Sequence, residues 1–124
     1  MITMELVENG HVAHYKISDP WTVSELVAFY PQETVYRDAV KYKIHAFADL
    51  TQAHKTPPNM LAARKGNPSL THPNSGQLVL VGISPLYEAI ASTIFRITHY
   101  TKAKLFLTEA EAWVYLRELI TNEQ

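Results

Sequence analysis

The fold is first indicated by residues 2–17, ITMELVENGHVAHYKI, in which two strand-like runs flank Asn9-Gly10. Asparagine and glycine tolerate the positive φ angles of a two-residue type I′ turn, so we expect an antiparallel hairpin of residues 2–8 and 11–17. Because side chains alternate across a strand, this register gives the hairpin one apolar face. The cross-strand pairs on that face are Ile2 with Ile17, Met4 with Tyr15 and Leu6 with Ala13.

Two histidines of this hairpin, His11 and His14, have a spacing that resembles a pair of metal ligands. On a strand these two side chains point to opposite faces, so no metal site is expected. We expect instead that each histidine pairs across the hairpin with Glu8 or Glu5.

Strand-like and helix-like segments alternate over the rest of the chain. Strands are expected at residues 44–50, 77–83 and 104–107, and helices at 22–41, 57–66, 85–97 and from 109 onward. The helix starts are marked by Thr22 with Glu25, Thr56 before Pro57, Ser84 before Pro85, and Thr108 with Glu111. Pro31 is expected to kink or restart the first helix. The order ββαβαβαβα predicts one α/β domain over residues 1–124, a mixed sheet in which the antiparallel hairpin precedes βα units, with helices packed on it.

Apolar side chains at helical spacing predict which face of each helix is buried. These are Val35, Tyr36, Ala39 and Val40 in the first helix, Leu86, Ala89, Ile90, Thr93, Ile94 and Ile97 in the third, and Ala112, Trp113, Leu116, Leu119 and Ile120 in the last. Five aromatic residues exceed what these faces require: Phe29, Tyr30, Tyr36, Phe95 and Tyr100. They fit either an apolar cavity, as in lipid-binding proteins with helices on a sheet, or the interface of a twofold homodimer, and we favour the interface.

Composition excludes several classes of protein. The 124 residues include no cysteine, which removes disulfides, thiolate metal sites and cysteine nucleophiles. The longest apolar runs, such as residues 78–81, are far shorter than the roughly 20 residues that span a bilayer. Glu5 lies where a secretory signal needs a basic flank, and no phosphate-binding loop, dinucleotide turn or nucleophile–base set is present. We therefore expect a small cytoplasmic domain that is not an enzyme and needs no cofactor.

Charge is unevenly distributed along the chain. The net charge is −1, which argues against nucleic-acid binding. Residues 1–49 carry −3, residues 50–108 carry +5 and residues 109–124 carry −3, and no carboxylate occurs from residue 50 to residue 87. The basic middle segment is either a set of solvated side chains or a surface that attracts an anion or an acidic partner.

Three stretches resemble a known family: FADLT at residues 47–51, VLVG at 79–82 and KLFLTEAEAWVYL at 104–116. With the order of elements they are similar to the STAS domain, the fold of bacterial anti-sigma-factor antagonists, and more closely to the small stand-alone SpoIIAA-like proteins. The resemblance implies a non-catalytic regulatory or protein-interaction domain, with a phosphorylated serine in an Asp-Ser-Ser-Gly-type turn after the third strand. This sequence has QAHKTPP at residues 52–58 instead, so Thr51 and Thr56 are the phosphoacceptor candidates.

Ligands of open parallel sheets bind beyond the carboxyl ends of the strands, where helix N-termini favour anions. Here those ends lie at residues 49–51, 82–84 and 107–108, and the acid-poor segment leaves from the first of them. The candidate ligand-binding residues are Asp49, Thr51, His54, Lys55, Thr56, Ser84 and Arg96. Helix capping by itself also explains the threonines and the serine.

No catalytic residue is assigned, because His45, Phe47 and Asp49 share one strand face but no nucleophile accompanies them. The leading hypothesis is a non-catalytic regulatory or interaction domain whose partner is another protein. The alternative is a binding protein for a lipid-like or anionic small molecule, and in both cases we expect a homodimer.

Overall fold

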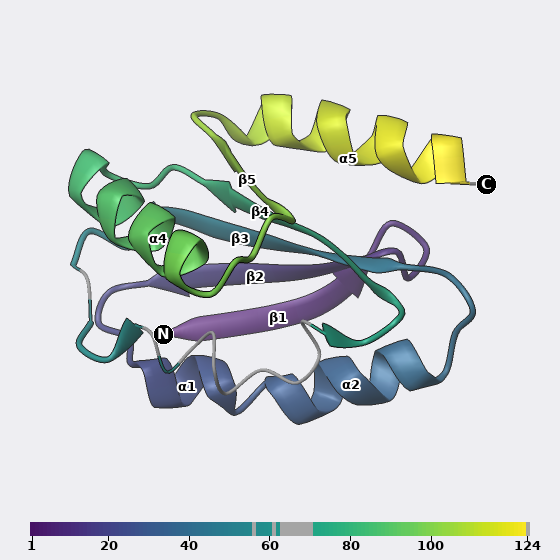
Figure 1. Ribbon diagram of the computed structural model, residues 1–124, viewed down its shortest axis with the longest axis horizontal. Helices are drawn as coiled ribbons and strands as arrows, with labels where there is room; N and C mark the ends of the chain where they lie inside the picture. The colour runs from purple at the N-terminus through teal and green to yellow at the C-terminus, as the bar shows by residue number, and fades with distance from the viewer. Residues whose placement is uncertain (56, 61, 63–70, 124) are drawn as a thin grey trace.

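A five-stranded mixed β-sheet forms the centre of the molecule in the computed structural model, which describes residues 1–55, 57–60, 62 and 71–123 (Figure 1). The strands lie side by side in chain order: β1 (Ile2–Val7), β2 (Val12–Ser18), β3 (Ile44–Gln52), β4 (Ser75–Val81) and β5 (Ala103–Phe106). β1 pairs with β2 antiparallel, and the three other pairs are parallel. The predicted mixed α/β sheet is therefore confirmed, whereas most of the helix expected at 57–66, with Thr56, lies outside the described residues.

The N-terminal hairpin has the predicted register, with Ile2 opposite Ile17 and Leu6 opposite Ala13. β1 ends one residue earlier than expected, at Val7, and β2 begins one residue later, at Val12, because Glu8, Asn9 and Gly10 all have positive φ angles. Over Asn9-Gly10 the N–H of His11 donates to the carbonyl of Glu8 at 3.1 Å, as a type I′ turn requires.

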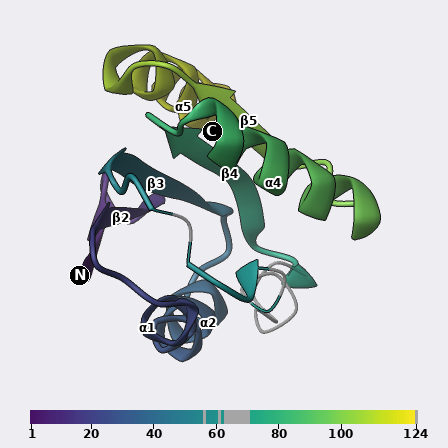
Figure 2. The ribbon, with the colours of Figure 1, turned by 90° about the vertical axis from the view of Figure 1, so that its left-hand side faces the viewer.

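Helices cover both faces of the sheet. α1 (Val23–Val27), α2 (Tyr30–Asp38) and α4 (Pro85–Ile97) lie on one face, and α5 (Glu109–Glu123) lies on the other (Figure 2). The predicted capping box begins α1, since the N–H of Glu25 donates to Thr22 Oγ1 at 3.1 Å and Glu25 Oε1 accepts from the N–H of Thr22 at 3.0 Å. The helix ends before Pro31, and α2 restarts with this proline in its first turn, as expected.

The buried faces of α2 and α4 differ from the predicted ones. In α2 the sheet side consists of Tyr30, Glu33 and Arg37, and Val35 is 63 % exposed. The prediction was wrong for Val35 and Ala39, whereas Tyr36 and Val40 pack against the core as expected. A buried ion pair, whose two residues are polar in the sequence, fills the rest of the inner face.

In α4 the inner side chains are Tyr87 and Ala91, whereas Leu86 and Ile97 are 68 % and 61 % exposed. The apolar side chains of α4 cover a wider arc of the helix than the sheet can bury. The face predicted from periodicity is therefore rotated from the buried face by about one residue, or 100°. A strip of apolar side chains on α4 is consequently left facing outward.

The opposite face of the sheet is a smaller core under α5. The predicted inner residues Ala112 and Leu116 are fully buried against Phe47, Val79 and Val81. The Trp113 indole stacks on Phe47, with the ring centroids 4.6 Å apart. None of the described helices has the length and apolar character required to cross a bilayer.

His14 corrects an expectation about the hairpin. Its ring does not pair with Glu5 but is buried between Phe47 and Trp113, with centroid distances of 4.9 and 5.7 Å. Glu8 instead binds Arg117 of α5 at 2.8 Å. α5 thus covers the His14 part of this hairpin face, whereas Thr3, Glu5 and Lys16 stay exposed, and the local sequence of the hairpin does not reveal this difference.

Candidate functional site

A largely apolar cavity of about 130 Å³ lies on the sheet face that α1, α2 and α4 cover. Small side chains create it, since Ala46 and Ala48 of β3 form its floor and Ala91 of α4 lies in its wall. Larger neighbours complete the wall: Ile17, Leu26, Leu50, Met60, Leu78, Leu80, Ile94 and Phe95. The cavity therefore depends on at least six separate elements of the chain.

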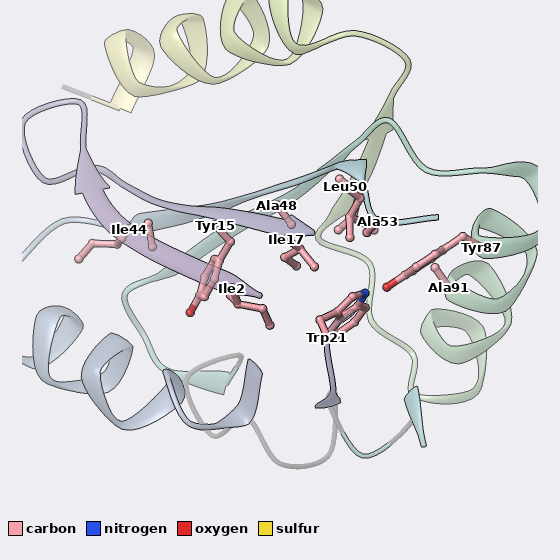
Figure 3. Close-up of a cluster of buried hydrophobic side chains, with 12 residues drawn as sticks. Ile2, Tyr15, Ile17, Trp21, Ile44, Ala48, Leu50, Ala53, Tyr87 and Ala91 are labelled. Atoms are coloured by element: carbon pink, nitrogen blue, oxygen red, sulfur yellow. The ribbon is translucent and has the colours of Figure 1, made fainter. Parts of the chain in front are cut away.

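One end of the cavity is aromatic. Trp21, which precedes the cap of α1, stacks on Tyr87 of α4 with the ring centroids 6.5 Å apart and the planes at 16°. The Trp21 nitrogen and the Tyr87 hydroxyl point toward one another (Figure 3), but no hydrogen bond joins them. Trp21 Nε1 has no partner among the described residues, and the Tyr87 hydroxyl makes only a 4.0 Å contact with the sulfur of Met60. This end thus offers flat apolar surface together with two hydrogen-bond donors, the Trp21 N–H and the Tyr87 hydroxyl.

The other end of the cavity is polar. The hydroxyl of Tyr15 donates to Glu33 Oε2 at 2.5 Å, and Arg37 Nη1 donates to Glu33 Oε1 at 2.7 Å. Arg37 Nη2 also donates to the carbonyl oxygen of Ile44 at 2.8 Å. Burial and the adjacent Glu33 carboxylate raise the pKa of Tyr15 above its ordinary range, so the phenol stays protonated. Tyr15 and Glu33 line the cavity, whereas Arg37 lies behind them.

These polar residues were missed by sequence reasoning, although a signal for them exists. Tyr30, Glu33 and Arg37 lie at i, i+3 and i+7 of one helix, and this spacing puts them on one face. A charged pair four residues apart is usually a solvated surface pair, so the pattern alone does not indicate burial.

The surplus aromatic residues do not form an exposed patch. Tyr30 and Phe95 line the cavity, and Phe29 packs edge-on against Tyr15 with the centroids 5.8 Å apart. Tyr36 packs against the same core, and Tyr100 contacts Phe95 at 5.6 Å. The structure therefore uses these residues for a cavity and its surroundings, which was the less favoured of the two interpretations.

Three of the residues predicted for an anion site, Asp49, Thr51 and Ser84, lie at the carboxyl ends of β3 and β4. Asp49 Oδ1 accepts hydrogen bonds from the N–H and the hydroxyl of Thr51, at 3.0 and 2.6 Å. Thr51 packs closely against Gly82, where an added Cβ would lie 2.4 Å from Thr51 Cγ2. Ser84 caps α4, because its Oγ accepts from the N–H of Tyr87 at 3.2 Å.

The remaining candidates are distributed differently. Asp19 accepts hydrogen bonds from the backbone N–H groups of His54 and Lys55, at 2.6 and 3.4 Å, so a carboxylate of the chain itself already occupies these donors. Arg96 lies twelve residues after Ser84 on α4, about 18 Å along the helix axis. The structure thus brings Asp49, Thr51 and Ser84 to one end of the sheet and leaves Arg96 at the other.

His45 has a structural environment under α5. Its Nδ1 accepts from the N–H of Gln77 at 2.8 Å, so the ring proton is on Nε2 and is donated to Glu123 Oε1 at 2.7 Å. Burial lowers the pKa of His45 more than Glu123 raises it, and burial likewise lowers the pKa of His14. Both imidazoles are therefore neutral near pH 7.

Acidification below about pH 6.5 is expected to destabilise the fold through these two histidines. An unfolded histidine has a pKa of 6.5, and both folded values are lower, so the unfolded chain binds more protons in this window. The free energy of unfolding should then fall by up to about 1.4 kcal/mol per pH unit for each histidine. Urea unfolding at pH 7.5, 6 and 5 measures this loss. His14→Phe should flatten the pH dependence, whereas a His54→Gln control at an exposed position should leave it unchanged; equal slopes in both variants would contradict the assignment.

The described residues contain no group of three or more histidine, aspartate or glutamate side chains placed to hold a metal ion. The cavity with its polar end is therefore the feature that geometry favours as the functional site. No protein-family model, curated protein or solved structure matches the chain.

Proposed function

We propose that this chain is a non-catalytic regulatory module of the STAS-like type that binds a small, largely apolar molecule in the cavity between α1–α2 and α4. The observation that carries the proposal is an apolar cavity of about 130 Å³ in a chain of only 124 residues. Protein interiors are packed closely, and voids that exceed a water molecule are few. An apolar cavity of roughly 150 Å³ is known to bind benzene, so this volume fits a ligand about as large as one aromatic ring.

The proposed ligand contacts follow from the wall. Trp21, Tyr87 and Phe95 supply aromatic surface. Burial of an apolar ring against it contributes a favourable free energy of about 25 cal/mol for each Å² of apolar surface removed from water. The mixed sheet with helices on both faces supports the STAS-like part of the proposal, and the three sequence stretches that resemble that family add to it.

Ligand binding is expected to raise the melting temperature of the protein. Benzene, toluene and indole at millimolar concentration should each stabilise the folded state, because stabilisation grows with the ratio of ligand concentration to Kd. Ala91→Leu fills the cavity and should abolish this rise, and Ala91→Val is a smaller filler if leucine prevents folding. Ala110→Leu is the matched control, since Ala110 is exposed on α5 at the other face of the sheet. Equal ligand-induced shifts in the Ala91 and Ala110 variants would contradict the proposal.

For the homodimer we propose the outward strip of α4 as the contact surface. Leu86 and Ile97 are the exposed apolar side chains at its two ends, and the small Ala89 and Thr93 lie between them. Antiparallel pairing with α4 of a second copy, centred near Ser92, places Leu86 beside the second Ile97. In this twofold pairing the apolar strip of each copy contacts the same strip of the other copy.

Replacement of Leu86 or Ile97 by lysine is expected to convert a dimer into a monomer. Light scattering coupled to size-exclusion chromatography at about 100 µM measures the molar mass directly. Val114→Lys is the matched control, because Val114 is 67 % exposed on α5 at the other face of the sheet. A monomeric wild-type protein, or equal dissociation by the Val114 variant, would overturn this surface.

A further inference from the structure

On the basis of the proposed function, we infer that the cavity selects neutral molecules that carry a hydroxyl group on an apolar body, and that it rejects carboxylates of similar size. The selecting group is the pair Tyr15–Glu33 at the polar end. This ligand class differs from the anionic ligand expected at the carboxyl ends of the strands, because it follows from the charge and hydrogen-bonding capacity of the cavity wall.

Glu33 is the only charged side chain among the described residues of the cavity wall. Among the described residues each of its oxygens receives one hydrogen bond, from Tyr15 and from Arg37, and each carboxylate oxygen can accept a second one. Glu33 therefore retains the capacity to accept a hydrogen bond from a ligand.

Tyr15 presents an acceptor as well. Its hydroxyl hydrogen is committed to Glu33, and the raised pKa of the phenol keeps that hydrogen in place. What remains on the side of the ligand is the hydroxyl oxygen, which has lone pairs to offer. Both members of the pair thus favour a ligand that donates a hydrogen bond.

The position of Arg37 explains why an anion is disfavoured. Its Nη1 and Nη2 donate to Glu33 and to the Ile44 carbonyl, and it does not line the cavity. A carboxylate at the polar end of the cavity would therefore meet the Glu33 charge, in surroundings where water screens poorly. It would also lose its own hydration without gaining a cation from the wall.

Toluene, phenol and benzoate form a probe series that tests this selection, with Kd measured by NMR titration at pH 7.5. We expect phenol to bind wild-type protein and benzoate to bind at least tenfold more weakly. Glu33→Gln replaces the charged acceptor by a neutral one, and it should weaken phenol binding about tenfold relative to toluene. Tyr15→Phe frees Glu33 Oε2, so the phenol hydroxyl can take the vacated place and the preference for phenol over toluene should increase.

Tyr87→Phe is the matched control, because it removes a hydroxyl from the opposite wall. It should leave the phenol-to-toluene ratio unchanged, and a ratio that falls in this variant but not in the Glu33 variant would overturn the inference. Benzoate binding as tight as phenol would do the same. If Glu33→Gln does not fold, the Kd values of the three probes for wild-type protein, Tyr15→Phe and Tyr87→Phe still test the selection. Toluene binding without any preference for phenol refutes only the selection, whereas failure of all three probes refutes the proposed function.

Discussion

Replacement of Gly76 by alanine is expected to lower the free energy of unfolding by about 3–5 kcal/mol, as the sum of overpacking and lost hydrogen bonds. A Cβ at Gly76 would lie 2.1 Å from Nδ1 and 2.5 Å from Cε1 of His45. Contacts this short do not occur in real proteins, so the imidazole has to move. His45 is only 2 % exposed, and its ring is held at both nitrogens, by the N–H of Gln77 and by Glu123.

Displacement of the ring would break both of these hydrogen bonds and open the contact between the sheet and the end of α5. Urea unfolding followed by tryptophan fluorescence measures the loss, and circular dichroism reports whether α5 stays helical. A double-mutant cycle with His45→Ala supplies the control, because alanine removes the ring that the new methyl group strikes. The double variant should be less destabilised than the sum of the two single ones. Strict additivity would show that the two residues do not collide.

The local parts of the fold could be predicted from the sequence because their signals are local. Asn9-Gly10 sets the hairpin register, and the pair Thr22 and Glu25 sets the start of α1, each through contacts within a few residues. The buried face of α5 was predicted for a related reason, since its apolar residues Ala112 and Leu116 occupy one narrow stripe.

The inward faces of α2 and α4 could not be predicted in this way, because each depends on what the sheet offers. Arg37 is acceptable in the interior because Glu33 and the Ile44 carbonyl accept hydrogen bonds from its Nη1 and Nη2, although its Nε has no partner among the described residues. Ala91 faces inward although larger apolar residues of the same helix are exposed. The spacing of apolar residues in a helix shows which faces are apolar, but it does not show which of two apolar faces packs against the sheet.

An apolar cavity was predicted only as the less favoured use of the surplus aromatic residues, and its position in the fold was beyond prediction for a similar reason. It exists because small side chains on β3 and α4 face one another across a gap, and no local pattern records that juxtaposition. The carboxyl-end site shows the converse problem. Asp49, Thr51 and Ser84 were predicted to lie together from topology alone, but the topology did not reveal that Asp19 binds the neighbouring backbone N–H groups.

Arg37→Met is expected to destabilise the protein by about 3–5 kcal/mol, which is the usual result of removing one partner from a buried ion pair. The Arg37 and Glu33 side chains are 2 % and 4 % exposed, and methionine would leave the carboxylate buried with Tyr15 as its one remaining partner among the described residues. Arg37→Lys should recover only part of the loss, because a single ammonium group does not reproduce the two-pronged contact with Glu33 and the Ile44 carbonyl.

The double variant Glu33→Gln with Arg37→Met tests whether the loss arises from the stranded charge. With no buried charge left, the double variant should be more stable than Arg37→Met alone, as measured by urea unfolding at pH 7.5. Arg117→Met is the matched surface control, since Arg117 pairs with Glu8 at 2.8 Å but its side chain is 62 % exposed. Its loss should stay below about 1 kcal/mol. Equal losses at positions 37 and 117 would show that the buried pair contributes no more to stability than a solvated one.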